Sequence, residues 1–199
     1  MNTISNNFNP PKEDIDPLIY LYKNGRLQDV LDKSDNMVLK YSYSIFLYNL
    51  RGSANALLKK FDAALDCYKK ALSINPNNAA IYNNLGNVFK EKEELELAEN
   101  NYKKAIKIKP NYAEAYYGLG LALEKKEEFL SAINSYENAL INKPNYPEVL
   151  FNLGNVYRKS GDYELAIKNY KNATKIKNDY YEAYCNLGNS KKDLGDVKS

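Results

Sequence analysis

The sequence contains no histidine, no tryptophan and only two cysteines, and these absences exclude several kinds of chemistry. Without histidine, the chain cannot build a Ser-His-Asp or Cys-His catalytic centre, nor a zinc site with an imidazole ligand. Cys67 and Cys185 are too few for a four-thiolate metal site, and they lie too far apart along a stack of helices to form a disulfide. We therefore expect no metal, no cofactor and no catalytic residues, and a protein that is not an enzyme.

Net charge and long apolar runs are scarce as well. The 28 basic and 25 acidic side chains leave a net charge of +3, which is too small to attract nucleic acid or an anionic membrane. The longest apolar run, Leu18 to Tyr22, is far too short to span a bilayer, and the N-terminal sequence MNTISNNFNPPKED lacks the basic-then-apolar order of a secretion signal. We expect a cytoplasmic protein that binds neither nucleic acid nor membrane.

What the sequence has in abundance is internal repetition. The segments YNNLG, YYGLG, LFNLG and YCNLG follow one another at intervals of 34 residues. If each unit is numbered so that its glycine is position 8, alanine recurs at positions 20 and 27, tyrosine at position 24 and proline at position 32. The complete units are residues 45–78, 79–112, 113–146 and 147–180, and a partial unit covers 181–199.

Each unit has the pattern of two amphipathic helices, which we name helix A and helix B. Apolar or small residues recur at helical spacing at positions 4, 7, 8 and 11, and again at positions 17, 20, 24, 27 and 28. A glycine inside a helix costs about 1 kcal/mol relative to alanine, so its recurrence predicts that another helix approaches closely there. Proline at position 32 is expected to end helix B.

The order of a large aromatic residue, Leu-Gly, alanine, tyrosine, alanine and proline over 34 residues resembles the tetratricopeptide repeat. The resemblance implies an all-α solenoid, a right-handed superhelix of antiparallel helix pairs with a concave groove that binds partners. Residues 11–44 have the pattern of a degenerate capping repeat, with helices near 15–23 and 26–33. Residues 1–10 are polar and asparagine-rich, and we expect them to be disordered.

Helix A has a second stripe, at positions 2, 5, 6, 9, 12 and 13, which lines the concave surface in the resembled family. Asparagine recurs at positions 6 and 9, and a side-chain amide both donates and accepts hydrogen bonds, so the stripe suits the backbone of an extended peptide. The arrangement resembles the asparagine ladder of protein O-linked N-acetylglucosamine transferases, matched here at Asn84, Asn152 and Asn186. The predicted groove residues are Asn83, Asn84, Asn87, Tyr117, Leu121, Phe151, Asn152, Asn155, Arg158, Asn186 and Asn189.

The ladder has one interruption and one competing interpretation. In the third unit, Gly118 and Leu121 replace both amides, which predicts a gap in the track or an apolar pocket. The chain contains 28 asparagines, so the stripe also fits an ordinary solvated polar face. The clamp by which some tetratricopeptide proteins hold acidic chaperone tails needs lysine at position 5, where this chain has Asn83, Tyr117 and Phe151.

The sequence thus predicts a protein-interaction scaffold that binds an extended peptide or partner segment, as a monomer or with weak self-association through the terminal half-repeat. A second interpretation is the substrate-recognition arm of a larger glycosyl-, sulfo- or methyltransferase, because residues 11–44 resemble the start of bacterial proteins that join such repeats to these enzymes. The partial unit 181–199 fits either a chain cut from a longer one or a final solvating helix. Gly195 is expected to begin the turn after the last helix A.

Overall fold

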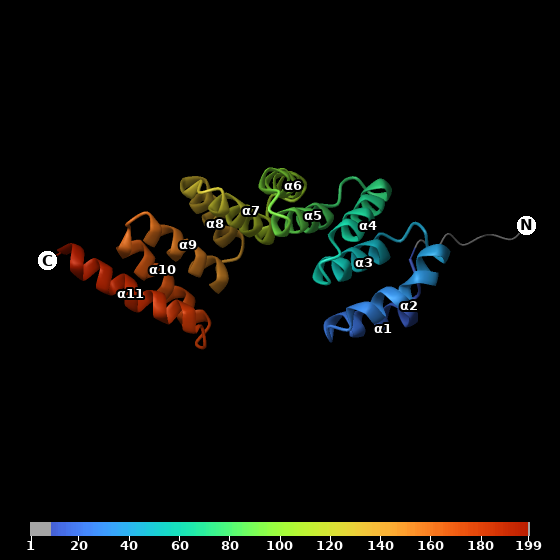
Figure 1. Cartoon of the computed structure of the whole chain (residues 1–199), viewed down its shortest axis with the longest axis horizontal. Coiled ribbons are helices and arrows are strands. Elements are labelled where there is room, and N and C mark those ends of the chain that lie inside the picture. The colour runs from blue at the N-terminus through green and yellow to red at the C-terminus, as the bar shows by residue number, and fades with distance from the viewer. Residues whose placement is uncertain (1–8, 199) are drawn as a thin grey trace, which may run out of the picture. The chain divides into compact units, whose positions relative to one another are not determined.

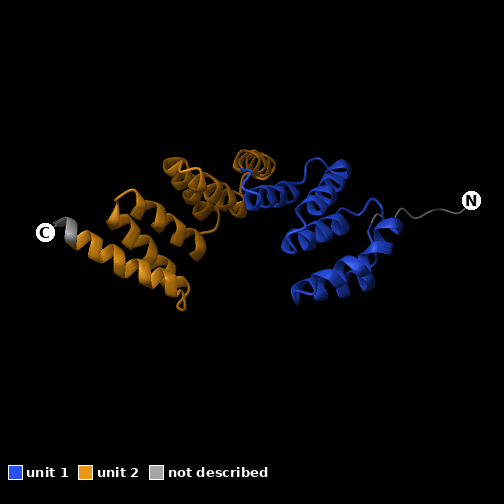
Figure 2. Ribbon diagram, in the orientation of Figure 1, with its two compact units in different colours: residues 1–94 blue, residues 95–199 orange. Residues whose placement is uncertain are grey.

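The structure, a computed structural model, describes residues 9–198, with side chains described up to residue 195. Within this range the regular elements are eleven α-helices, without any strand. The helices form two compact units, residues 1–94 and 95–199, which Figure 2 shows in different colours. The segment predicted to be disordered, residues 1–10, lies outside the described range except for its last two residues.

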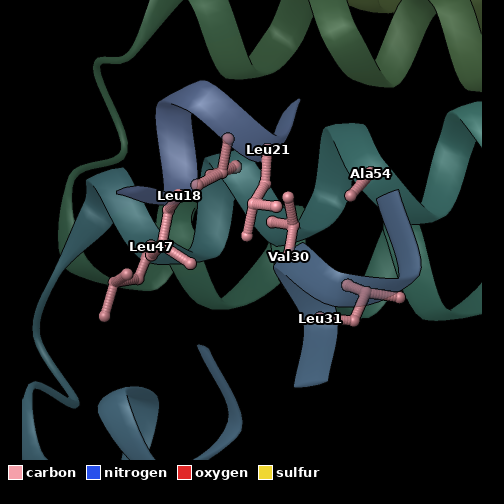
Figure 3. Packing of buried hydrophobic residues seen from close by; sticks show 7 residues of the cluster. Leu18, Leu21, Val30, Leu31, Leu47 and Ala54 are labelled. Atoms are coloured by element: carbon pink, nitrogen blue, oxygen red, sulfur yellow. The ribbon is translucent and has the colours of Figure 1, made fainter. Parts of the chain in front are cut away.

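The first unit contains five helices, and each packs against the next along the chain. They are α1 (Lys12–Lys23), α2 (Leu27–Lys40), α3 (Ile45–Leu57), α4 (Phe61–Ile74) and α5 (Ala79–Glu91), as labelled in Figure 1. One buried apolar cluster joins the capping helices α1 and α2 to the first repeat (Figure 3). Its members are Leu18, Leu21, Val30, Leu31, Leu47, Leu50 and Ala54.

The second unit contains six helices, again each packed against the next. They are α6 (Leu95–Ile108), α7 (Ala113–Lys125), α8 (Phe129–Asn142), α9 (Pro147–Lys159), α10 (Tyr163–Ile176) and α11 (Tyr181–Lys198). The alanines and the tyrosine of helix B are fully buried, as Ala132, Tyr136 and Ala139 are on α8. The two-helix repeat expected from the sequence is therefore the building unit of the fold.

Every helix A except the last ends in the same left-handed turn. The residue at position 15 has a positive φ in each case: Gly25 (72°), Lys59 (58°), Glu93 (62°), Glu127 (60°) and Gly161 (81°). The next amide returns to a carbonyl of the helix, as Glu128 N does to Leu123 O at 2.9 Å, which closes a Schellman motif. The same turn therefore directs the chain from helix A into helix B in successive units.

The glycine at position 8 is explained by the tyrosine at position 24 of the same unit. The pairs are Gly52 with Tyr68, Gly120 with Tyr136, and Gly154 with Tyr170. A Cβ atom added to Gly52 would lie only 2.5 Å from the ring of Tyr68, a distance that close packing of carbon atoms does not allow. Glycine thus lets the buried ring lie directly against helix A, and the predicted close approach is confirmed.

The ends of α2 and α11 differ from the expectation, and so does the cause of the end of helix B. Helix B ends at position 30 in the fourth unit as in the others, although Asn178 replaces the proline there, so proline is not what ends it. Helix α2 continues past residue 33 to Lys40, because Met37 and Val38 pack against the buried cluster. Helix α11 runs through Gly195 to Lys198, so the turn expected at Gly195 does not form.

Arg51 occupies position 7, where the next three units have leucine. From α3, its Nη1 donates to Leu31 O at 2.9 Å and to Ser34 Oγ at 2.7 Å, while Nη2 pairs with Asp35 Oδ1 at 2.7 Å. The side chain of Ser34 is fully buried. Arg51 therefore supplies hydrogen bonds to groups of α2 that have lost contact with water.

Replacing Arg51 by leucine, the residue of the following units, is expected to destabilise the protein by roughly 1–2 kcal/mol. Leucine gains apolar contact, but it leaves the Leu31 carbonyl and the Ser34 hydroxyl without their charged donor. Denaturant unfolding measures the change. The matched control is Arg26→Leu, which removes an exposed pair with Asp29 and should change stability by no more than about 0.5 kcal/mol. A stabilised Arg51→Leu protein would contradict this account.

Candidate functional site

We call the side of the A helices that carries positions 5, 6, 9, 12 and 13 the inner face. On it, side chains 35 residues apart bond across neighbouring A helices, because one repeat plus one residue places them side by side. In the first compact unit, residues 1–94, Asn84 Nδ2 donates to Asn49 Oδ1 at 2.9 Å. In the second compact unit, residues 95–199, the pairs are Asn152 Nδ2 to Tyr117 OH at 2.9 Å, Arg158 Nε to Asp193 Oδ2 at 2.9 Å, and Lys159 Nζ to Glu124 Oε1 at 2.8 Å.

The three ladder asparagines are held in place by the protein itself. Asn84, Asn152 and Asn186 are half-buried, and each donates to a neighbouring helix, Asn186 to Asn155 Oδ1 at 2.9 Å. An amide has two N–H groups and an oxygen that accepts twice, so each of these side chains retains hydrogen-bonding capacity. The first unit thus presents one preorganised, partly occupied amide, at Asn84, and the second unit presents two, at Asn152 and Asn186.

The two aromatic residues at position 5 pack within the protein. The ring of Tyr117 lies 6.1 Å from that of Tyr136 and 5.2 Å from that of Tyr146. Phe151 repeats the arrangement one unit later, 5.9 Å from Tyr170 and 5.0 Å from Tyr180. Both residues remain half-buried, so they border the inner face and also fill space between helix A, helix B and the following loop.

The inner face of the first unit contains an open, largely apolar pocket of about 390 Å³. Its walls come from the cap, from the end of α3, and from α4 and α5. The lining residues are Tyr22, Ser53, Ala56, Leu57, Lys59, Phe61, Tyr68, Asn84, Asn87, Val88 and Glu91. The predicted groove residues include the two asparagines but not Tyr22 and Leu57, although these two occupy positions 12 and 13 of their repeats, on the inner face.

The inner face of the second unit contains a pocket of similar size, about 400 Å³, with a polar and charged lining. Helices α7, α9, α10 and α11 contribute to it. The lining residues are Glu124, Asn155, Arg158, Lys159, Tyr163, Tyr170, Asn186 and Asp193. Asn155, Arg158 and Asn186 were predicted groove residues, and the structure brings these three together in one pocket. The signal that identifies the charged partners Glu124, Lys159 and Asp193 is the spacing of 35 residues.

Two buried phenols organise this charged pocket. Tyr136 donates to Glu124 Oε2 at 2.9 Å, and burial together with the Glu124 charge raises the pKa of Tyr136 far above its ordinary value. Tyr170 donates to Asn155 Oδ1 at 2.7 Å, and burial raises the pKa of Tyr170 to about 12. Both phenols therefore stay protonated at neutral pH and hold their acceptors in fixed positions.

One predicted groove residue, Asn83, does not face the groove. Its side chain is buried, with 7% exposed, and its Oδ1 has no hydrogen-bond partner among the described residues. The residue 35 positions further on is Gly118, which has no side chain to donate a hydrogen bond. By contrast, Asn87 and Asn189 are exposed.

In the third repeat, where the sequence predicts a gap in the track or an apolar pocket, the structure shows how the space beside Gly118 is filled. Gly118 is buried, and the ring of Tyr102 occupies the space where its Cβ would lie. Leu121 is half-buried, and Tyr117 is engaged by its aromatic neighbours. The interruption of the amide track, one of the two predicted outcomes, therefore remains a prediction.

The described residues offer little for metal binding or thiol chemistry. They contain no group of three acidic or cysteine side chains placed to hold a metal ion. Burial raises the pKa of the Cys67 thiol, which makes its thiolate scarcer, and Cys185 is exposed. None of the described helices combines the length and the apolar character that crossing a membrane requires.

Comparison with known proteins agrees with the repeat geometry. The family model described as TPR repeat matches residues 52–92, 86–127, 125–161 and 154–195. A crystal structure of MamA is 29% identical over 76% of this chain and 82% of that chain, with a TM-score of 0.68. YrrB, described as a TPR protein with an unusual peptide-binding site, is 22% identical over 91% of this chain and 93% of its own, with a TM-score of 0.66. Among curated proteins, none matches.

The antiparallel helix pairs and their asparagine-bearing inner face define an all-α repeat solenoid. The chain belongs to the tetratricopeptide-repeat family, since the family model covers most of its length. The predictions of fold and family are confirmed. The resemblance to transferase fusion proteins finds no support in these comparisons and stays a prediction.

Proposed function

We propose that this chain is a protein-interaction scaffold that binds an extended peptide segment of a partner on its inner face. The observation that supports this function most directly is the row of half-buried amides at Asn84, Asn152 and Asn186, each with unused hydrogen-bonding capacity. Each unit also has an open pocket of about 390 or 400 Å³ beside its amides. The likeness to YrrB, a peptide-binding protein of the same fold, points in the same direction.

The physical basis is the match between a repeated amide and a repeated peptide bond. An extended peptide presents one N–H and one C=O per residue, and repeated amides such as Asn152 and Asn186, on neighbouring A helices, meet these groups without regard to side-chain identity. Because neighbouring helices already hold the amides, less conformational entropy is lost when the peptide binds. The pockets then accept side chains and supply selectivity.

Changing Asn84, Asn152 and Asn186 together to alanine is expected to weaken peptide binding tenfold or more, since three hydrogen bonds of about 1 kcal/mol each are lost. The probe is a set of short random peptides displayed on phage and enriched on the unmodified protein. Their affinities for both proteins are then measured by fluorescence polarisation. A modest loss of stability is expected as well, because each amide also bonds to a neighbouring helix.

The matched control changes three exposed asparagines of the B helices, Asn100, Asn134 and Asn142, to alanine. This variant should bind the selected peptides as the unmodified protein does. If the library yields no binder, or if the ladder variant binds as tightly as the control, the proposed function is wrong. The second result would favour the solvated polar face as the role of these asparagines.

A further inference from the structure

Two acceptor groups of the pocket in the second unit, the Glu124 carboxylate and the Asn155 side-chain oxygen, are already engaged by the protein. Glu124 accepts from Tyr136 on Oε2 and from Lys159 on Oε1, at 2.9 and 2.8 Å. Asn155 Oδ1 accepts from both Tyr170 and Asn186, at 2.7 and 2.9 Å. A ligand donor would therefore compete with existing hydrogen bonds at these two groups.

The donors of the same pocket are in surplus. A guanidinium has five N–H groups, and Arg158 uses only its Nε, toward Asp193 Oδ2, among the described side chains. Its two terminal amino groups have no partner there, and neither does Asn155 Nδ2. The Arg158 side chain is 36% exposed, so the end of the guanidinium is accessible from the pocket.

The charges of the pocket do not repel an anion. Arg158 is balanced by Asp193 and Lys159 by Glu124, so the lining is neutral in sum. A carboxylate that meets the two terminal amino groups of Arg158 forms a bidentate, charge-assisted pair while the Nε bond to Asp193 is retained. Since the pocket of about 400 Å³ is far larger than one carboxylate, it has room for the side chain or chain end that carries the group.

We propose that this pocket is a subsite for one carboxylate of the bound peptide, with Arg158 as the main contact and Asn155 as a second donor. The inference rests on the proposed peptide-binding function and names the ligand chemistry of one part of it. Unlike the clamp that holds acidic chaperone tails, the proposed subsite does not depend on a lysine at repeat position 5. The pocket of the first unit has no arginine in its lining and, beside Lys59, presents Tyr22, Leu57 and Phe61, so of these two pockets that of the second unit is the one that offers a bidentate partner for a carboxylate.

A test that needs no natural ligand uses three small probes on the whole protein. N-acetylglycine carries a chain-terminal carboxylate, N-acetyl-aspartyl-N-methylamide a side-chain carboxylate, and N-acetyl-asparaginyl-N-methylamide no charge. The chain has only three arginines, Arg26, Arg51 and Arg158, so their Nε–H signals can be followed separately by NMR. The first two lie in the other unit and serve as internal references.

We expect saturable shifts of the Arg158 Nε–H signal and of the Asn155 amide with a carboxylate probe and none with the neutral probe. The probe that saturates at the lower concentration identifies the source, a chain terminus or an acidic side chain. Arg158→Gln removes the Arg158 signal and should abolish the shift of the Asn155 amide. Arg26→Gln should preserve the shifts of both the Arg158 and the Asn155 signals. Equal shifts with the neutral probe, equal shifts at Arg26, or shifts that persist in Arg158→Gln would overturn the proposal.

The phage-selected peptides separate this inference from the function on which it rests. The selected set should be enriched in peptides with an acidic residue or a free C-terminus, and Arg158→Gln should weaken their binding about tenfold. If the peptides depend on the asparagine ladder but not on Arg158 or on a carboxylate, the scaffold function stands and the carboxylate subsite is wrong. If Arg158 responds to the small carboxylates while no peptide is enriched, the subsite stands and peptide binding is wrong.

Discussion

Gly120→Ala is expected to destabilise the protein by roughly 2–3 kcal/mol, although alanine is the better helix former. The added methyl group would collide with the ring of Tyr136, which is fully buried and hydrogen-bonded to Glu124. The ring cannot move aside without breaking that bond and disturbing the contact between α7 and α8. Thermal or denaturant unfolding measures the loss.

The control for this prediction lies at the same repeat position. A Cβ added to Gly188 would meet no atom within 4 Å among the described residues, so Gly188→Ala should stabilise α11 by about 0.5–1 kcal/mol through helix propensity alone. Opposite signs at two equivalent positions would show that the neighbouring ring, and not the backbone, selects glycine. A destabilised Gly188→Ala protein or a neutral Gly120→Ala protein would contradict this explanation.

Unfolding at alkaline pH is expected to be steep because the tyrosines at position 24 are buried as neutral phenols. Burial raises the pKa of Tyr68 and of Tyr170 to about 12, and that of Tyr136 rises further beside Glu124. In the unfolded chain a tyrosine titrates near pH 10. The free energy of unfolding therefore keeps its full value below about pH 10. It falls as the pH rises toward 12, by roughly 2–3 kcal/mol for each buried tyrosine, because the unfolded chain loses its phenol protons first.

The effect is isolated by comparing the unmodified protein with Tyr68→Phe, which loses one titrating phenol and its bond to Ser53. Urea unfolding between about pH 9 and about pH 12 should show a decline in stability that is smaller in the variant by roughly 2 kcal/mol. Lysines titrate in the same range in both proteins, so their contribution cancels in the comparison. Parallel curves for the two proteins would contradict the role assigned to the buried phenol.

The two pockets of the inner face differ in the ligand groups that they can bind. The first unit offers apolar walls next to Asn84 and Asn87, and the second offers the free donors of Arg158 next to Asn155 and Asn186. If the amide ladder binds backbone groups of any sequence, selectivity comes from these pockets. Arg158 and the apolar walls around Leu57 are therefore the places where a change in partner preference is expected.

Much of the fold could be predicted because its signals are local or strictly periodic. The helical spacing within each unit predicts helices A and B, and the register of Gly52 with Tyr68 and of Gly154 with Tyr170 predicts a close helix pair. Non-glycine residues in the left-handed turn, Glu93 and Glu127, gave no such signal. Their conformation is imposed by the packing of helix A on helix B and not by their own preference.

The candidate site was predictable only in outline. The stripe of asparagines is visible from spacing alone, but the bond between Asn84 and Asn49 and the pair formed by Arg158 and Asp193 depend on how neighbouring A helices are offset. The burial of Asn83 depends on the same offset. Period and composition do not contain this information, because a shift of one helix along its axis leaves both unchanged.

By itself, then, the sequence determined the family, the two helices of each repeat and the close approach of a second helix at the repeated glycine, because each follows from residue size and spacing along one segment. The tertiary structure alone decided which amides bond to one another, that Arg51 serves the cap, and that the terminal amino groups of Arg158 are left without a protein partner among the described residues of the charged pocket. These properties arise where side chains from separate repeats meet, and the geometry of that meeting is set by packing between helices.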